Sequence, residues 1–145
     1  MKSSFYLFPI IIVIVVIVTS SCSKSSSPTS NQNDIKLYTA SLSTIQQSIM
    51  GKWQLTYMHG GFTGMDTVYF KNQYWQFLNN NRVIETVNNA VVTDTTIVWN
   101  FIQSWNTYSM KIQSQYYLMD SILNNVLTIH DYTSEPYYYH FIKVN

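Results

Sequence analysis

An apolar run near the start of the chain is followed by a sharply polar segment. Nearly every residue from Phe5 to Val18 is apolar, Lys2 precedes the run, and a stretch of Thr and Ser follows it. A helix that crosses the hydrocarbon core of a bilayer needs about 20 apolar residues, so the run is short for a permanent anchor. The order of basic residue, apolar run and small residues is typical of a secretory signal peptide. We predict such a peptide over residues 1–21.

The segment after the apolar run has the composition of a linker. Residues 23–34 are almost entirely Ser, Thr, Asn, Gln, Lys and Pro. Such a segment cannot bury enough apolar surface to offset the entropy lost when it becomes ordered. We therefore predict a flexible tether over residues 22–40 and a folded domain over residues 41–145.

Apolar residues at helical spacing follow the predicted tether. Leu42, Ile45 and Ile49 lie three and four residues apart, which places them on one face of a helix. Serines near the start of this segment are suitable N-caps, and Gly51 is a suitable stop. The pattern predicts one short helix over residues 41–50.

Beyond Gly51 the pattern changes to β-rich segments separated by Gly, Asn, Ser and Pro. Most intervals are about ten residues long, which is typical of consecutive antiparallel hairpins and too short for the crossover helices of a parallel sheet. Alternation predicts that Trp53, Leu55 and Tyr57 share one face of the first strand. The pattern predicts eight antiparallel strands, over residues 52–59, 66–78, 82–88, 91–102, 106–113, 116–122, 126–132 and 137–144.

Composition favours a single domain with a substantial core. Of the 145 residues, 46% are apolar, 16% are aromatic and only 10% are charged. Eight Lys and Arg residues oppose seven Asp and Glu residues, and removal of the leader with Lys2 balances the two signs. Nucleic-acid binding depends on an excess of positive charge, so it is disfavoured.

The single cysteine, Cys22, stands directly after the small residues that end the apolar run. This arrangement resembles the lipobox of bacterial lipoproteins, although Thr19 occupies a position where an aliphatic residue is usual. The resemblance implies that Cys22 carries acyl chains such as palmitate, which anchor the protein to a membrane. The alternative is an ordinary signal peptide, which would leave Cys22 as an unpaired thiol in an oxidising compartment.

The residues after Cys22 bear on the location of the protein in the cell envelope. By resemblance to the sorting rules of such lipoproteins, Ser23 stands where an aspartate would mark retention in the inner membrane. This implies the outer membrane. The next few residues lack the acidic side chains that resemble a surface-export signal, which favours the periplasmic face over the cell surface.

The start of the first strand carries a second resemblance. Gly51-Lys52-Trp53 resembles the Gly-x-Trp signature of the lipocalin barrel, and Gly60-Gly61-Phe62 follows soon after. Over residues 42–145 the chain looks like the lipocalin-like domains of Bacteroidetes lipoproteins. The resemblance implies an all-β, eight-stranded, antiparallel up-and-down barrel closed at one end, with a short N-terminal helix. It also implies that Trp53 packs across that end, where Lys143 is the nearest cation. The alternative fold is an immunoglobulin-like sandwich.

The abundant aromatic residues suggest two functions. If the barrel is hollow, inward aromatic residues would bind a small apolar or amphipathic ligand. If it is filled, exposed tyrosines from Tyr116–Tyr117 and Tyr137–Tyr139 would contact a glycan or a partner protein. The candidate ligand-lining residues are Trp53, Leu55, Tyr57, Phe62, Trp75, Phe77, Trp99 and Tyr108.

The chain carries no recognisable catalytic motif. Neither a nucleophile elbow, a His-Glu-x-x-His helix nor a phosphate-binding loop is present, so we expect a binding protein rather than an enzyme, without a cofactor. If the last hairpin turns around Glu135, His130 and His140 lie opposite one another. Two imidazoles fall short of the three or four ligands of a typical metal site, so we expect no metal. The oligomeric state is left open.

Overall fold

The computed structural model describes residues 34–62 and 66–144 of the chain. The predicted signal peptide, Cys22 and the first part of the predicted tether lie outside these residues. Within the described part, no helix is both long and apolar enough to cross a membrane.

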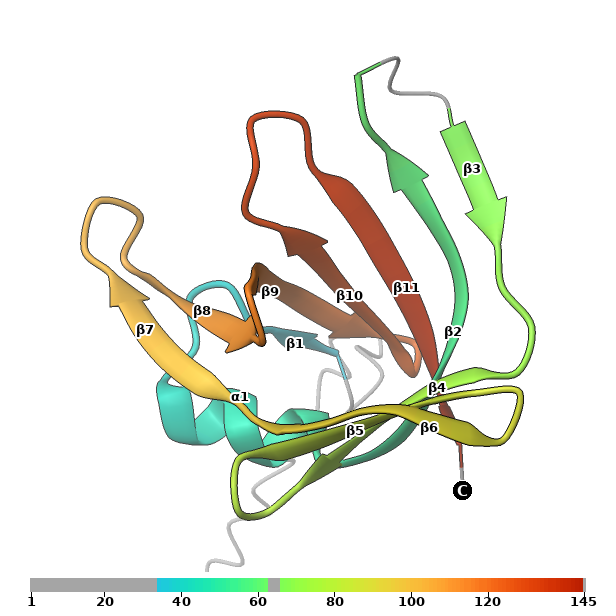
Figure 1. Cartoon of the computed structure of the whole chain (residues 1–145). Helices are drawn as coiled ribbons and strands as arrows, with labels where there is room; N and C mark the ends of the chain where they lie inside the picture. Colours follow the sequence, from blue (N-terminus) through green and yellow to red (C-terminus); the bar gives the residue numbers. More distant parts are fainter. Residues whose placement is uncertain (1–33, 63–65, 145) are drawn as a thin grey trace, which may run out of the picture.

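One short helix and a single antiparallel sheet make up the described chain (Figure 1). The helix is α1 (Leu42–Ile49). The strands are β1 (Ile35–Lys36), β2 (Gly51–Gly60), β3 (Asp66–Tyr69), β4 (Gln73–Leu78), β5 (Arg82–Val87), β6 (Ala90–Thr96), β7 (Val98–Ile102), β8 (Thr107–Ile112), β9 (Gln115–Leu123), β10 (Val126–Asp131) and β11 (Tyr137–Val144).

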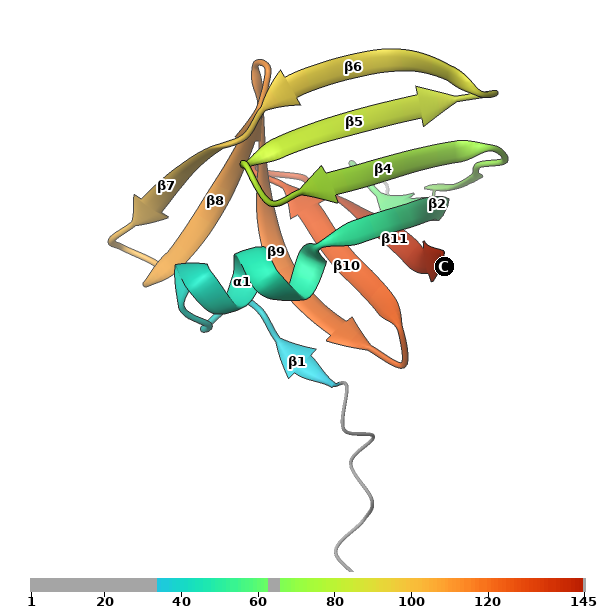
Figure 2. The ribbon, with the colours of Figure 1, turned by 90° about the horizontal axis from the view of Figure 1, so that it is seen from below.

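The sheet curls on itself as one continuous meander. Its strand order is β6-β5-β4-β2-β11-β10-β9-β8-β7, with β1 paired to β9 and β3 paired to β2. Strands β2 and β11, from opposite ends of the domain, are neighbours, while the path ends at β6 and β7, which are successive along the chain (Figure 2). The prediction of an all-β antiparallel fold is therefore confirmed. A single sheet also differs from the two sheets of the sandwich alternative.

Two of the eight predicted strands are each divided in two, and β1 was not predicted, so the described chain has eleven strands where eight were predicted. The segment 66–78 is interrupted at residues 70–72, where Asn72 has a left-handed φ of 56°, so β3 and β4 pair with different parts of β2. The segment 91–102 is interrupted at Ile97, whose N–H donates to the Asn81 carbonyl 2.6 Å away. Strands β6 and β7 consequently pair with different neighbours, β5 and β8.

The predicted helix is confirmed, and its ends have clear causes. The Ser41 side chain accepts a hydrogen bond from the Thr44 N–H at 3.2 Å, which caps the first turn. Ile45 and Ile49 are buried against the sheet. The Trp53 indole N–H donates to the Ile49 carbonyl at 2.6 Å, which satisfies one of the free carbonyls at the helix end. Helix α1 thereby lies across one end of the curled sheet (Figure 2).

The packed part of the chain begins before residue 41, which corrects the predicted tether of residues 22–40. Strand β1 pairs with Ile122 and Ser121 of β9 beyond the stretch that β8 occupies. The Leu37 side chain is 0% exposed, and its N–H donates to the Asp120 carbonyl at 2.9 Å. Backbone pairing along a free stretch of β9 orders residues that lie between the polar segment 23–34 and the helix, and that the prediction had included in the tether.

Two hairpin turns show why the predicted breaks are correct. Asn88-Asn89 and Asn124-Asn125 all have positive φ, between 50° and 68°. Two-residue hairpin turns of the type that matches strand twist need positive φ at both central residues, and asparagine tolerates it better than most side chains. These turns are therefore determined locally by residue type.

Candidate functional site

Half of the predicted ligand-lining residues are packed into the core. Trp53, Leu55, Trp75 and Phe77 are all buried, together with Phe141 from the last strand. The ring centroids of Trp75 and Phe141 are 5.1 Å apart, and those of Trp75 and Phe77 are 6.1 Å apart. Aromatic side chains in mutual contact thus fill this part of the interior.

Tyr57 lies on the opposite face from Trp53 and Leu55, which corrects the predicted alternation. Phe141 pairs with Leu55 but His140 pairs with Tyr57, so Thr56 is an extra residue in β2. An extra residue of this kind is a β-bulge, and it shifts every following side chain to the other face. Tyr57 consequently stacks on His140, with ring centroids 4.3 Å apart.

Two further predicted residues lie away from the helix end of the interior. Phe62 follows the end of β2 by two residues, and its side chain is 88% exposed. Tyr108 is half-buried, and its ring lies 5.0 Å from that of Phe101 on the neighbouring strand. The structure therefore brings neither residue to the cavity described next.

A cleft of about 390 Å³ opens between α1, the β4–β5 turn and the start of β7. It combines apolar side chains with amide side chains, and it contains two of the predicted ligand-lining residues, Phe77 and Trp99. Cavities that bind small molecules are of similar size, about 300–1,000 Å³, and have this mixture of apolar walls and a few polar groups. The lining residues are Ser43, Gln46, Gln47, Ile49, Met50, Phe77, Leu78, Asn79, Asn81, Ile97 and Trp99.

Asn81 joins the three elements that form the cleft. Its side-chain Oδ1 accepts hydrogen bonds from Gln46 Nε2 at 2.8 Å and from Trp99 Nε1 at 3.2 Å. Its backbone carbonyl accepts from the Ile97 N–H, and its φ of 56° is left-handed. Sequence reasoning identified Asn81 only as a turn residue and did not identify Gln46, since neither residue carries a motif. Asn81 is 35 residues from Gln46 and 18 residues from Trp99 along the chain.

The cleft is electrically neutral. None of its lining residues carries a formal charge at neutral pH. The adjacent Arg82 forms a double hydrogen bond with Asp94, which raises the pKa of the arginine and lowers the pKa of the aspartate. The nearest cation along this turn is therefore already paired.

A second group of aromatic side chains lies deeper in the curled sheet. The Tyr117 ring meets Trp75 and Tyr139 edge-on, with centroids 5.4 Å and 5.7 Å apart. Burial is the main cause that raises the pKa of Tyr139 to about 12, and it raises the pKa of Tyr117 further, so both hydroxyls stay protonated at neutral pH. The Trp75 indole nitrogen is buried without a hydrogen-bond partner. Tyr117 and Tyr139 are thus interior residues and not part of an exposed tyrosine surface.

The opposite face of the sheet carries a row of tyrosines and histidines. His59 stacks on Tyr138 with centroids 5.3 Å apart, and His140 Nε2 lies 3.0 Å from His59 Nδ1. Burial, followed by the nearby His59, lowers the pKa of His140. Tyr69, on β3, extends the row and is 78% exposed. We call the residues Tyr57, His59, Tyr69, Tyr138 and His140 the outer aromatic row.

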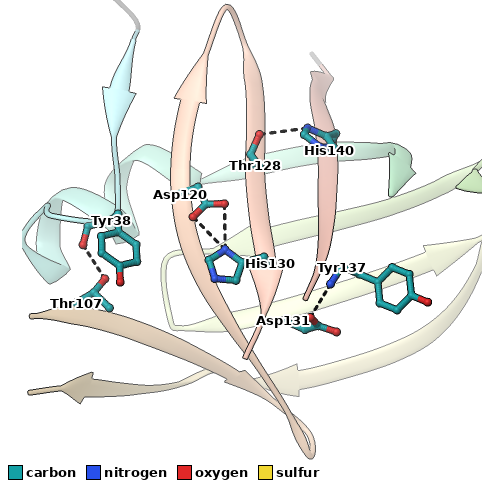
Figure 3. A network of polar contacts seen from close by, with 8 residues as sticks. All are labelled: Tyr38, Thr107, Asp120, Thr128, His130, Asp131, Tyr137 and His140. Atoms are coloured by element: carbon teal, nitrogen blue, oxygen red, sulfur yellow. Dashed lines mark hydrogen bonds and ion pairs between the residues drawn. The ribbon is translucent and has the colours of Figure 1, made fainter. Parts of the chain in front are cut away.

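The predicted pairing of His130 with His140 is wrong by two residues. His140 pairs with Thr128, whose hydroxyl lies 3.3 Å from His140 Nδ1 (Figure 3). His130 pairs with Tyr138. The hairpin register depends on Asp131, whose carboxylate accepts from the Tyr137 N–H at 2.8 Å. His130 instead contacts the Asp120 carboxylate at 3.0 Å.

Within the described residues there is no group of three or more His, Cys, Asp or Glu side chains that could hold a metal ion. No protein-family model, curated protein or solved structure was found to match the chain. The function must therefore be inferred from the site itself.

Proposed function

We propose that this protein is a lipid-anchored binding protein of the outer membrane, on its periplasmic face, and that it binds a small amphipathic ligand in the cleft between α1, the β4–β5 turn and β7. The single observation that carries the ligand-binding proposal is the cleft itself. It joins an apolar wall, from Phe77, Ile97 and Trp99, to a rim of amide side chains. This combination suits binding, and we propose no catalytic activity.

The anchor is proposed from the leader sequence. A short apolar run followed by small residues and Cys22 supports cleavage and acylation at that cysteine. Two or more acyl chains give stable attachment, since each buried methylene contributes about 0.8 kcal/mol. The attached domain would then face the aqueous compartment.

The finer description of the fold is also a proposal. We propose a lipocalin-like up-and-down barrel of eight strands, in which β3 with β4 and β6 with β7 each count as one bent strand. The neighbouring positions of β2 and β11 support this count. So does Lys143, whose Nζ lies 5.3 Å from the centre of the Trp53 ring. In this description the ligand occupies the helix end rather than a deep interior, because aromatic contacts fill the space around Trp75.

Native mass spectrometry of the full-length protein, released from detergent, tests the binding proposal. We expect a mass above the denatured mass, and we expect the Trp99→Ala variant to lose the excess because Trp99 forms one wall of the cleft. Trp105→Ala is the matched control, since Trp105 is exposed and does not line the cleft. Equal native and denatured masses would contradict the proposal, as would an excess that survives in Trp99→Ala.

The outer aromatic row supports a second candidate function, recognition of a glycan or a partner protein. The supporting observation is the exposure of Tyr69 beside the stacked rings of Tyr57 and His140. Tyr69→Ser is expected to weaken attachment to the glycan or protein that co-purifies with the envelope fraction, while Tyr132→Ser, at an exposed tyrosine elsewhere, leaves it unchanged. Equal effects of the two changes would remove the outer aromatic row from consideration.

A further inference from the structure

We propose that the ligand of the cleft is a neutral saccharide, a mono- or disaccharide without a carboxylate, phosphate or ammonium group. This inference rests on the proposed function, which assigns ligand binding to the same cleft. It adds the chemical class of the ligand. Three properties of the cleft carry it: its neutrality, its fixed hydrogen-bonding groups and its aromatic wall.

Neutrality argues against a charged ligand. The lining residues include no Lys, Arg, His, Asp or Glu. Arg82 is the closest basic residue along the turn, and its guanidinium is held by both carboxylate oxygens of Asp94. An ionised carboxylate or phosphate entering the cleft would lose hydration without gaining a counter-charge, which is costly. A fatty acid is therefore a poor fit.

The hydrogen bonds around Asn81 determine which polar atoms face a ligand. Asn81 Oδ1 already accepts from Gln46 Nε2 and Trp99 Nε1, so the amide orientation is set and the two Nδ2 hydrogens are left to donate elsewhere. Gln46 donates through Nε2, which leaves its Oε1 as an acceptor. The cleft therefore presents a donor group and an acceptor on adjacent side chains. A hydroxyl both donates and accepts, so hydroxyls suit this pair.

The same hydrogen bonds define the apolar wall. The Trp99 indole N–H is already bonded to Asn81, so the ring offers its apolar surface to a ligand. Phe77 and Ile97 lie beside it in the cleft and are buried. A sugar ring has an apolar C–H face and a hydroxyl edge, which match an aromatic surface next to amide groups. A purely apolar ligand would instead cover these amides without bonding to them, at a cost in free energy.

The test compares probes of different charge on the full-length protein in detergent. Tryptophan fluorescence and ligand-observed NMR are recorded with methyl glucoside, methyl galactoside, maltose, cellobiose and N-acetylglucosamine, and a glycan array extends the set. Glucuronate is the charged sugar control, and decanoate is the anionic amphiphile. We expect at least one neutral saccharide to bind, glucuronate to bind at least about tenfold more weakly than its neutral counterpart, and decanoate not to bind.

Two matched variants connect the result to the cleft. Asn81→Asp keeps the Oδ1 acceptor for Gln46 and Trp99 but replaces the free amide donors with a charged oxygen, so we expect saccharide binding to weaken about tenfold or more. Asn80→Asp makes the same charge change at an exposed position of the same turn that does not line the cleft, and we expect little change. Far-ultraviolet circular dichroism verifies that both variants are folded.

The outcomes separate this inference from the proposed function. One outcome is that decanoate binds, that its binding is lost in Trp99→Ala, and that no saccharide binds. This outcome would overturn the saccharide class while supporting ligand binding in the cleft. Saccharide binding that is equally reduced in Asn80→Asp and Asn81→Asp would also overturn it, since the effect would then be one of charge alone. If none of the probes binds and the native and denatured masses are equal, both proposals are overturned.

Discussion

Leu37 provides a direct test of where the folded domain begins. Its side chain is fully buried in the core although it lies within the predicted tether of residues 22–40. The Leu37→Ala change removes the branched part of that side chain and keeps the backbone hydrogen bond from Leu37 N–H to the Asp120 carbonyl. The effect should therefore come from lost packing.

The magnitude follows from the complete burial of the side chain. Replacing a buried leucine by alanine lowers the free energy of unfolding by about 2–5 kcal/mol, depending on how far the surroundings collapse into the cavity. We expect about 3 kcal/mol, near the middle of this range. The segment can collapse only in part into the cavity, because it is bonded to Asp120 of β9 on one side and, through the Tyr38 carbonyl, to the Thr107 hydroxyl of β8 at 2.6 Å on the other. For a domain of this size the loss corresponds to a decrease in melting temperature of roughly 10–20 °C.

Urea unfolding of the full-length protein in detergent, followed by tryptophan fluorescence and circular dichroism, measures this loss by linear extrapolation. Lys36→Ala is the control, because Lys36 is the exposed residue directly before Leu37, and its expected effect is below about 0.5 kcal/mol. If Leu37→Ala were as mild as this control, residues 35–40 would not be part of the folded domain, and the tether would extend to residue 40 as predicted from the sequence.

Two further predictions concern pH and the anchor. The pKa of His140 is lowered in the folded protein, so the unfolded chain binds the proton more readily; the resulting stability is present above the ordinary value of 6.5 and is lost as the pH falls below it. Urea unfolding at pH 7.5 and 5.5 should show this loss, and His140→Gln should show a smaller one; an unchanged loss would assign it to other groups. Cys22→Ser is expected to abolish incorporation of labelled palmitate and to move the protein from the membrane to the soluble fraction, whereas label retained in Cys22→Ser would rule out this cysteine as the acylation site.

Local patterns predicted the elements well where neighbouring residues decide them. The helix over residues 41–50 follows from apolar spacing and a serine cap, and both are properties of a few consecutive residues. Turns such as Asn88-Asn89 follow from the tolerance of asparagine for positive φ. The strands were predicted from the turns on either side of them. A bend within a long strand was therefore missed, as at Ile97, where the predicted strand 91–102 is divided in two.

The candidate site was predicted less completely because its residues come from distant parts of the chain. Phe77 and Trp99 were selected as aromatic strand residues, and both line the cleft. Gln46 and Asn81 were not selected, since an amide on a helix and an amide in a turn have no special pattern. Tyr57 was assigned to the wrong face because alternation cannot reveal the extra residue at Thr56.

The sequence by itself determined the antiparallel β class, the short helix, most turns and the expectation of an envelope anchor at Cys22. These depend on residue type and on spacings of a few residues. Only the tertiary structure decided which residues meet: the pairing of β2 with β11, the hairpin register that places His140 beside Thr128, and the cleft around Asn81. The physical reason is that register and bulges depend on backbone hydrogen bonds between distant segments, and one extra residue reverses the face of every side chain that follows.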